Sequence, residues 1–166
     1  SIGMHKLSKY KLWTLSFITM SVVFAGCSWA SGPDVSPMGN AVASEITVFR
    51  SPTCDCCSLW IDHMEASGFQ VKDEITEEMP KIKQQYAVPA NLRSCHTTVV
   101  DGYVLEGHIP SEDVQRLLKE KPDIAGLAVP GMPIGSTGME SGNYVEPYTV
   151  FSFQENSTVA TFAEHS

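Results

Sequence analysis

The stretch EITVFRSPTCDCCSLWIDHMEASG, residues 45–68, predicts a short strand, a turn and a helix in direct succession. The apolar run at 46–49 indicates the strand, and the Ser51-Pro52 pair ends it. The helix is indicated by apolar side chains at roughly helical spacing, namely Leu59, Trp60 and Met64. Three of the chain's five cysteines therefore fall where the strand turns into the helix.

The chain then continues in the order strand, helix, strand, strand, helix. The predicted segments are a strand at 69–75, a helix at 77–88, a hairpin of strands at 97–100 and 103–107, and a helix at 111–122. Ser111 is able to cap the last of these helices. This β-α-β-α-β-β-α order, with cysteines at the start of the first helix, predicts an α/β, thioredoxin-like three-layer fold.

Residues 124–147 are rich in glycine and proline and predict a long ordered loop. Two alternating runs follow, at 148–153 and 158–162, and predict a terminal hairpin that either extends the sheet or packs on the loop. We therefore expect one domain at 45–166 with a C-terminal loop and hairpin extension. Residues 31–44, which precede it, predict a flexible linker.

The N-terminal segment differs from the rest of the chain. Three lysines precede an apolar run at 12–25, which indicates a secretory signal peptide at 1–30 and export to the periplasm. The run has about 14 residues and is short for a bilayer core of ~30 Å. FAGC, ending at Cys27, resembles a lipoprotein box; cleavage after Ala30 or Ala43 is the alternative. We expect membrane attachment only if Cys27 is acylated.

The charge of the chain bears on its partners. The formal net charge is −8, and loss of the signal peptide would remove three lysines and no carboxylate, leaving 8 basic and 19 acidic residues, or about −11. Such a domain is not suited to bind the phosphate backbone of a nucleic acid. It suits cations and cationic partners better.

A fourth cysteine of the predicted domain, Cys95, lies in the segment RSCHTTVV just before the third strand. In a thioredoxin-like fold this segment lies beside the N-terminus of the first helix, where thioredoxins carry a cis-proline that meets the substrate. We therefore expect Cys95 and His96 to point at Cys54, Cys56 and Cys57. The positive potential at the helix N-terminus favours thiolates there.

Two chemical interpretations of these cysteines are open. In an exported protein they could form two structural disulfides. However, Cys56 and Cys57 are adjacent and unsuited to bridge each other, and a Cys54–Cys57 bond closes a tight, labile loop. Alternatively, thiolates and imidazole bind Cu(I) or Zn(II). Four sulfurs and a histidine exceed what one tetrahedral zinc ion needs, and closely spaced thiolates bridge metals, which favours a copper cluster.

Methionine adds to the copper prediction. Met132 and Met139 lie in a glycine- and proline-rich loop, where a thioether suits Cu(I) ligation as well as core filling. Ligation by His108, Met139 or Met64 is left open, and Glu106 is a candidate outer partner of a histidine. The predicted metal ligands are Cys54, Cys56, Cys57, Cys95, His96 and Met132.

Three runs, SPTCDCCSLWIDHMEASGF, LRSCHTTVVDGYVLEGHIP and IAGLAVPGMPIGSTGME, together resemble the CopG-type periplasmic proteins, long described as a domain of unknown function. The resemblance covers about residues 45–153. It implies a thioredoxin-like fold, copper bound by the CxCC cysteines together with Cys95, and a role in copper resistance.

Three functions remain open at this point. The first is a periplasmic protein that binds Cu(I) and Cu(II) in a cysteine-rich site, with one copper ion or a multinuclear cluster, and is able to interconvert the two oxidation states. The second is a thioredoxin-type thiol-disulfide oxidoreductase in which Cys54 attacks and Cys57 resolves. The third is a carrier that delivers copper to a periplasmic efflux or redox partner.

Overall fold

The computed structural model describes residues 44–166. The predicted signal peptide at 1–30, with Cys27, and the linker up to residue 43 lie outside the described residues. Within the described part of the chain, every helix is too short or too polar to cross a membrane.

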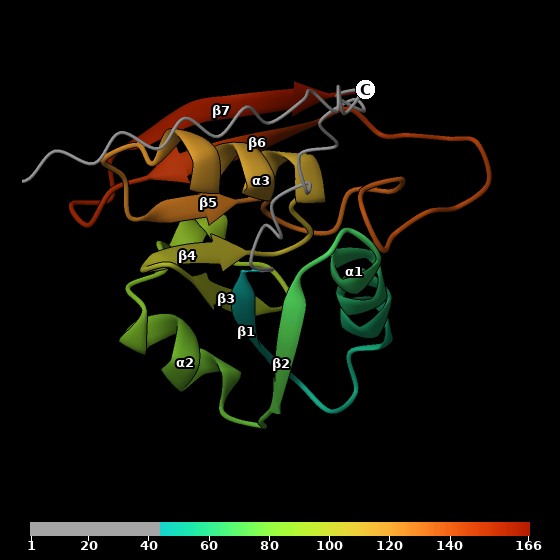
Figure 1. Cartoon of the computed structure of the whole chain (residues 1–166), viewed down its shortest axis with the longest axis horizontal. Coiled ribbons are helices and arrows are strands. Elements are labelled where there is room, and N and C mark those ends of the chain that lie inside the picture. Colours follow the sequence, from blue (N-terminus) through green and yellow to red (C-terminus); the bar gives the residue numbers. More distant parts are fainter. Residues whose placement is uncertain (1–43) are drawn as a thin grey trace, which may run out of the picture. The chain divides into compact units, whose positions relative to one another are not determined.

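Seven strands form one mixed sheet, in the order β2-β1-β3-β4-β5-β6-β7 (Figure 1). This architecture confirms the predicted α/β class. The elements are β1 (Glu45–Arg50), α1 (Asp55–Ala66), β2 (Gln70–Ile75), α2 (Met79–Gln85), the 3₁₀ helix η1 (Ala90–Leu92), β3 (Thr97–Val100), β4 (Tyr103–Glu106), α3 (Ser111–Glu120), β5 (Gly126–Ala128), β6 (Tyr148–Phe153) and β7 (Val159–His165).

The pairing of β1 with its two neighbours sets the position of the cysteines. β2 runs parallel to β1, while β3 is antiparallel to β1 and places Thr97 opposite Phe49. β4 is antiparallel to β3. The thioredoxin-like arrangement remains a prediction, and these pairings support it.

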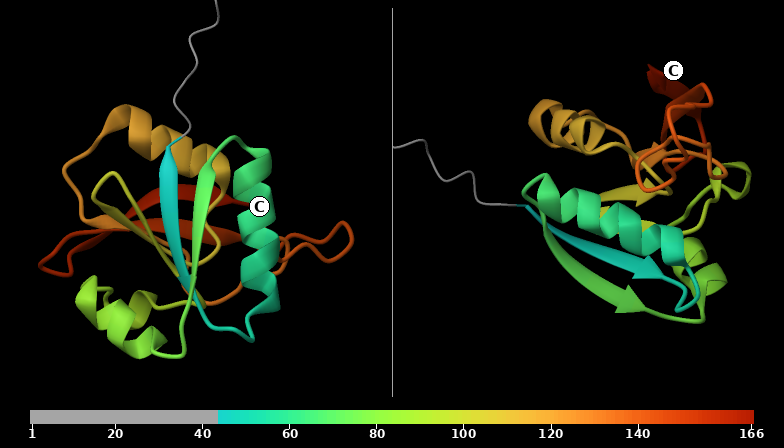
Figure 2. Two further views of the ribbon diagram at one scale, coloured as in Figure 1. Left: turned by 60° about the horizontal axis from the view of Figure 1, so that its bottom comes forward. Right: turned by 90° about the vertical axis from the view of Figure 1, so that its right-hand side faces the viewer.

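The two faces of the sheet bury different clusters of apolar side chains because successive residues of a strand point to opposite faces. Val48 and Leu105 belong to the larger cluster, with Trp60 of α1 and Leu117 of α3. Val104, one residue before Leu105, belongs to a second cluster on the opposite face, which includes residues that precede β3 and the end of β6. Figure 2 shows α1 running alongside β1 and β2. The larger cluster therefore fixes α1, and with it the cysteine-bearing turn, on the sheet.

The C-terminal hairpin extends the sheet through a strand that the sequence did not predict. β5 is only three residues long and pairs with both β4 and β6. A Cβ atom on Gly126 would lie 1.9 Å from the Val104 carbonyl oxygen. Glycine is therefore required for the close approach of these strands, which explains a glycine inside a strand.

The expected capping role of Ser111 is wrong. Pro110 occupies the N-cap position of α3, and the helix has no side-chain cap. The Ser111 hydroxyl instead accepts a hydrogen bond from the hydroxyl of Ser67, at 2.9 Å, and so links α3 to the end of α1.

The segment after β5 packs against α1. A Cβ atom on Gly138 would lie 2.8 Å from the backbone nitrogen of Trp60 and 3.2 Å from the Cys56 carbonyl oxygen. Gly138 also has a φ of 80°, so both space and conformation favour glycine there. This contact brings the loop to the first turn of α1, beside the cysteines.

Replacing Gly107 with alanine should destabilise the fold more than replacing Gly102. Both have positive φ, 82° and 83°, which costs an alanine about 1–2 kcal/mol. Only at Gly107 would the new Cβ also clash, lying 2.5 Å from Ser94 Oγ and 2.6 Å from the Val129 carbonyl oxygen. We expect the free energy of unfolding in urea to fall by about 1–3 kcal/mol more for Gly107→Ala than for the Gly102→Ala control. Equal losses would contradict the packing argument.

Candidate metal centre

The turn between β1 and α1 presents three cysteines at the start of a helix. Cys54 is the N-cap residue of α1, and its backbone N–H donates to the Ser51 carbonyl at 3.2 Å. Cys57, one turn into the helix, is fully buried, whereas Cys56 is half-buried. All three therefore lie in the positive potential of the N-terminus of α1.

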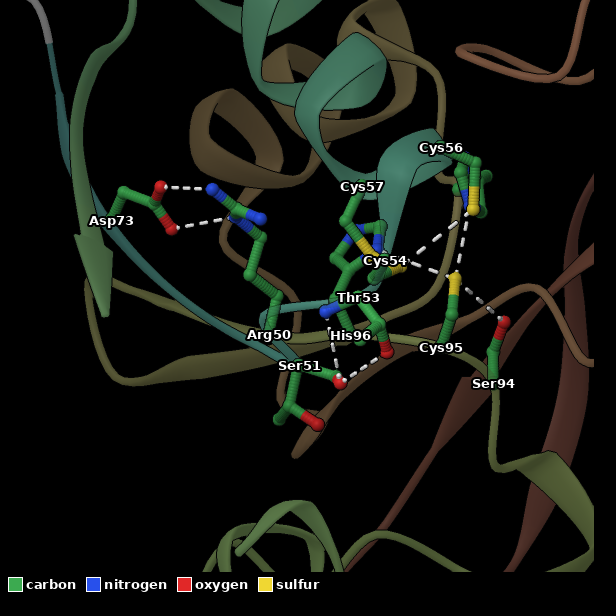
Figure 3. The surroundings of a disulfide bond; sticks show 12 residues. Arg50, Ser51, Thr53, Cys54, Cys56, Cys57, Asp73, Ser94, Cys95 and His96 are labelled. Atoms are coloured by element: carbon green, nitrogen blue, oxygen red, sulfur yellow. Dashed lines mark hydrogen bonds and ion pairs between the residues drawn. A yellow bond between two sulfur atoms is a disulfide. The ribbon is translucent and has the colours of Figure 1, made fainter. Parts of the chain in front are cut away.

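The structure brings together the four cysteines that the sequence predicts to be metal ligands. Cys54 and Cys57 form a disulfide, and Cys56 and Cys95 are free. Cys54 Sγ lies 3.6 Å from Cys56 Sγ. The sulfur atoms of all four lie within 4.8 Å of one another (Figure 3). Since two cysteines are free, the alternative of two structural disulfides does not describe this domain.

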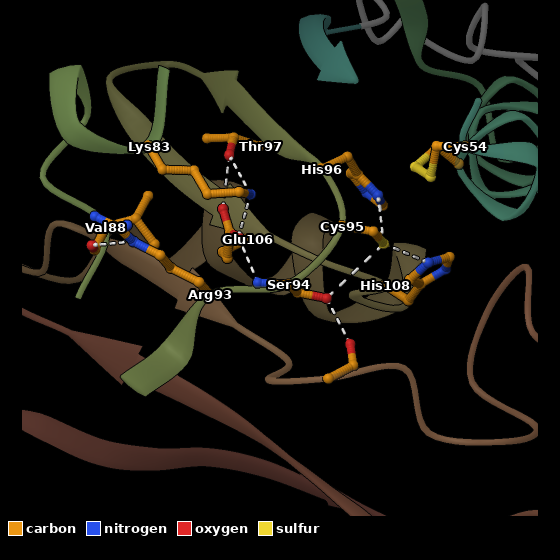
Figure 4. A network of polar contacts seen from close by, with 12 residues as sticks. Cys54, Lys83, Val88, Arg93, Ser94, Cys95, His96, Thr97, Glu106 and His108 are labelled. Atoms are coloured by element: carbon orange, nitrogen blue, oxygen red, sulfur yellow. Dashed lines mark hydrogen bonds and ion pairs between the residues drawn. A yellow bond between two sulfur atoms is a disulfide. The ribbon is translucent and has the colours of Figure 1, made fainter. Parts of the chain in front are cut away.

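Two histidines also lie beside Cys95 (Figure 4). His96 Nδ1 lies 3.5 Å from Cys95 Sγ, and His108 Nε2 lies 3.0 Å from it. His96 was predicted for the site; His108 was left open. The position of His108 directly after the hairpin that begins near Cys95 was the available sequence signal, and it was not sufficient to assign His108 as a ligand.

Hydrogen bonding sets the tautomer of His108. Its Nδ1–H donates to the Thr137 carbonyl oxygen at 2.7 Å, which leaves Nε2 with a free lone pair facing Cys95. Burial lowers the pKa of His108. A neutral imidazole whose second nitrogen is held by a backbone carbonyl is the usual form of a metal-binding histidine.

His96 is fully buried, and only one of its two ring nitrogens has a polar contact among the described residues. Its ring lies 4.5 Å from the Trp60 ring and 5.0 Å from the His108 ring, centroid to centroid. Burial lowers the pKa of His96 well below its ordinary value, so the ring is neutral. His96 Nε2 has no hydrogen-bond partner among the described residues.

Cys95 is a neutral thiol in the metal-free protein. Burial, together with the neighbouring Cys56, raises the pKa of Cys95 to about 11. A metal binds the thiolate, so an ion that binds Cys95 near neutral pH must displace the thiol proton. Metal binding at this residue is therefore coupled to proton release.

Glu106 does not orient a histidine, contrary to expectation. Its carboxylate accepts hydrogen bonds from Lys83 Nζ at 2.5 Å and Thr97 Oγ1 at 2.7 Å. It also accepts the backbone N–H of Ser94 at 2.6 Å. Glu106 therefore holds the backbone of the residue before Cys95, and the buried lysine compensates its charge.

Met132, Met64 and His63 have separate positions. Met132 lies in the loop after β5 with 52% of its surface exposed, and the neighbouring Gly131 carbonyl accepts a hydrogen bond from Ser94 Oγ. Ligation by Met132 stays a prediction. Met64 is fully buried in the core cluster, and His63 is exposed on α1.

The donor atoms fit copper by their chemistry. Thiolate sulfur is preferred by Cu(I), and imidazole nitrogen is also a good ligand of Cu(II) and Zn(II). Two groups of donor atoms share Cys95, one with four sulfurs and the other with Cys95 and two buried imidazoles. With the disulfide closed, two of the sulfurs are withdrawn from ligation, so the number of soft donors depends on the oxidation state of Cys54 and Cys57.

Comparisons with known proteins agree with this chemistry. Residues 92–139 match the family described as "Protein of unknown function, DUF411", a segment that contains Cys95, His96 and His108 but not the CxCC turn. No curated protein matches the chain.

Two solved structures are similar to the chain over most of the described domain. One is "Copper resistance protein copG- Form 2", with 41% identity and a TM-score of 0.72, covering 75% of this chain and 99% of that one. The other is "Copper resistance protein copG- Form 1", with 42% identity and a TM-score of 0.70, covering 73% and 96%.

The raised pKa of Cys95 predicts slow alkylation near neutral pH. The thiolate is the reactive form, and its fraction rises about tenfold per pH unit below the pKa. We expect the iodoacetamide rate at Cys95 of the metal-free protein, followed by peptide mass spectrometry, to keep rising from pH 8 to about pH 10. A plateau below about pH 9 would contradict the burial argument.

Proposed function

The chain belongs to the CopG copper-resistance family, and we propose that it is a periplasmic protein that binds copper ions through Cys54, Cys56, Cys57 and Cys95. One observation carries the proposal: four cysteine sulfurs from two distant segments lie within 4.8 Å of one another. Since thiolate sulfur is the donor that Cu(I) prefers, this group is well suited to bind Cu(I).

Reduction of the Cys54–Cys57 disulfide makes all four sulfurs available as thiolates. Thiolates this close are able to bridge copper ions, so we propose a multinuclear Cu(I) cluster, with His96 and Met132 completing the coordination. The helix N-terminus stabilises the negative charge of the thiolates. Glu106 holds the segment that carries Cys95 in place.

The same pair of cysteines is suited to change the oxidation state of copper. When Cys54 and Cys57 thiolates form a disulfide, the new S–S bond releases two electrons, which reduce two Cu(II) ions to two Cu(I) ions. The remaining thiolates of Cys56 and Cys95 then stay as ligands of Cu(I). In this scheme copper is the substrate, and the dithiol is restored by a periplasmic reductant.

A thiol-disulfide oxidoreductase is the second candidate, because a disulfide closes at the N-terminus of α1. Two features oppose it. Cys56 lies inside the motif with its sulfur 3.6 Å from Cys54 Sγ, where it competes for the disulfide. Cys95 also lies close to the pair, and in a thioredoxin-like fold it would take the place of the proline that a thioredoxin presents to its substrate.

Anaerobic titration of the reduced protein with Cu(I), followed by elemental analysis, tests copper binding. We expect at least one copper per chain, and a lower number after Cys54→Ser or Cys95→Ser, because each change removes a thiolate. His63→Ala is the matched control, since His63 is an exposed donor on the same helix as Cys54. Binding below one copper per chain that neither serine variant changes would rule the proposal out.

An insulin-reduction assay separates the two candidates. If copper is the substrate, the metal-free reduced protein should reduce insulin slowly, because Cys56 and Cys95 interfere with exchange at Cys54 and Cys57. Rapid turnover that added Cu(I) leaves unchanged would favour the oxidoreductase instead.

A further inference from the structure

Cys95 belongs to two groups of metal-binding side chains at once. One is the four-cysteine group; the other consists of Cys95, His96 and His108, whose ligand atoms also lie within 4.8 Å of one another. The second group contains neither Cys54 nor Cys57. It is therefore complete while the disulfide between those two residues is closed, as it is here.

We propose that the disulfide-closed protein binds one divalent ion, Cu(II) or Zn(II), through Cys95, His96 and His108. This inference rests on the proposed function, because it shares Cys95 with the proposed Cu(I) cluster. Two imidazoles and one thiolate form a donor set that suits Cu(II) in trigonal sites and Zn(II) in tetrahedral sites.

The spacing of the donor atoms fits a single ion. A tetrahedral ion with bonds of ~2.3 Å to sulfur and ~2.0 Å to nitrogen holds its sulfur and nitrogen ligands about 3.6 Å apart. In the structure, Cys95 Sγ lies 3.5 Å from His96 Nδ1 and 3.0 Å from His108 Nε2. Small side-chain movements are therefore enough to admit the ion.

Each histidine adds an independent argument. The Thr137 carbonyl accepts the Nδ1–H of His108, which aims the Nε2 lone pair at Cys95 before any metal arrives. His96 is fully buried, and its Nδ1 faces Cys95 Sγ at 3.5 Å. An ion placed between these two atoms would bind Nδ1 and leave Nε2 to carry the ring proton.

The disulfide then selects between two ligand sets that share Cys95. A dithiol reductant breaks the S–S bond by supplying two electrons and two protons, which gives the thiols of Cys54 and Cys57 and leaves the reductant as a disulfide. Two soft donors are thereby added near Cys95, while the two imidazoles stay in place. Reduction therefore shifts the preference of the site from a divalent ion to Cu(I).

Titration of the disulfide-closed protein with Co(II) tests the site, because Co(II) reports its ligands by absorption and does not oxidise thiols. Mass spectrometry verifies the closed Cys54–Cys57 bond. We expect one Co(II) per chain, with a sulfur-to-cobalt charge-transfer band. Cys95→Ser should abolish that band, and His108→Gln should weaken binding by about tenfold or more. His63→Ala, the exposed control, should change neither.

The outcomes separate this inference from the proposed function. Absence of Co(II) binding, or a charge-transfer band that survives Cys95→Ser, would overturn the three-residue site. So would unchanged affinity in His108→Gln. If the reduced protein nevertheless binds Cu(I) at the cysteines, only the divalent site is lost. Circular dichroism and the retained disulfide show whether each variant is folded.

Discussion

The antiparallel register between β1 and β3 is the constraint on which the site depends. Because Thr97 lies opposite Phe49, the chain before β3 runs back past the turn that follows β1. Cys95 is thereby placed beside the cysteines of α1, although 38 to 41 positions separate them in the sequence. A shift of the pairing by one residue would turn Cys95 to the opposite face of the sheet. The Lys83–Glu106 pair supports this register by holding Thr97 and the backbone of Ser94.

Burial of the site determines its chemistry. The raised pKa of Cys95 and the lowered pKa values of His96 and His108 have the same cause, which is desolvation of the charged form. All three are therefore neutral without metal, and a cation that binds there gains a thiolate only by releasing a proton. The two imidazoles bind added protons weakly and so keep their lone pairs for a soft or borderline metal ion. Its preference is then set by the redox state of the two cysteines at the turn.

The sequence was sufficient to predict the features that depend on local pattern. The strand that leads into the CxCC turn, the hairpin after Cys95 and the α/β class all follow from periodicity and turn residues. β5 was missed because three residues between glycine-rich segments carry no periodic pattern, and its role follows only from pairing with β4 and β6. The roles of His108 and Glu106 were not predictable, because their partners, Thr137 and Lys83, are reached only through tertiary packing.

The central claim is that Cys95 and the cysteines of the turn hold copper together. A crystal structure of the reduced protein reconstituted with Cu(I), with copper located by anomalous scattering, tests this most directly. The account predicts copper at bonding distance, ~2.3 Å by analogy with other metal–thiolate bonds, from Cys95 Sγ and from at least one of Cys54 and Cys57. Copper bound elsewhere, with Cys95 free, would contradict it.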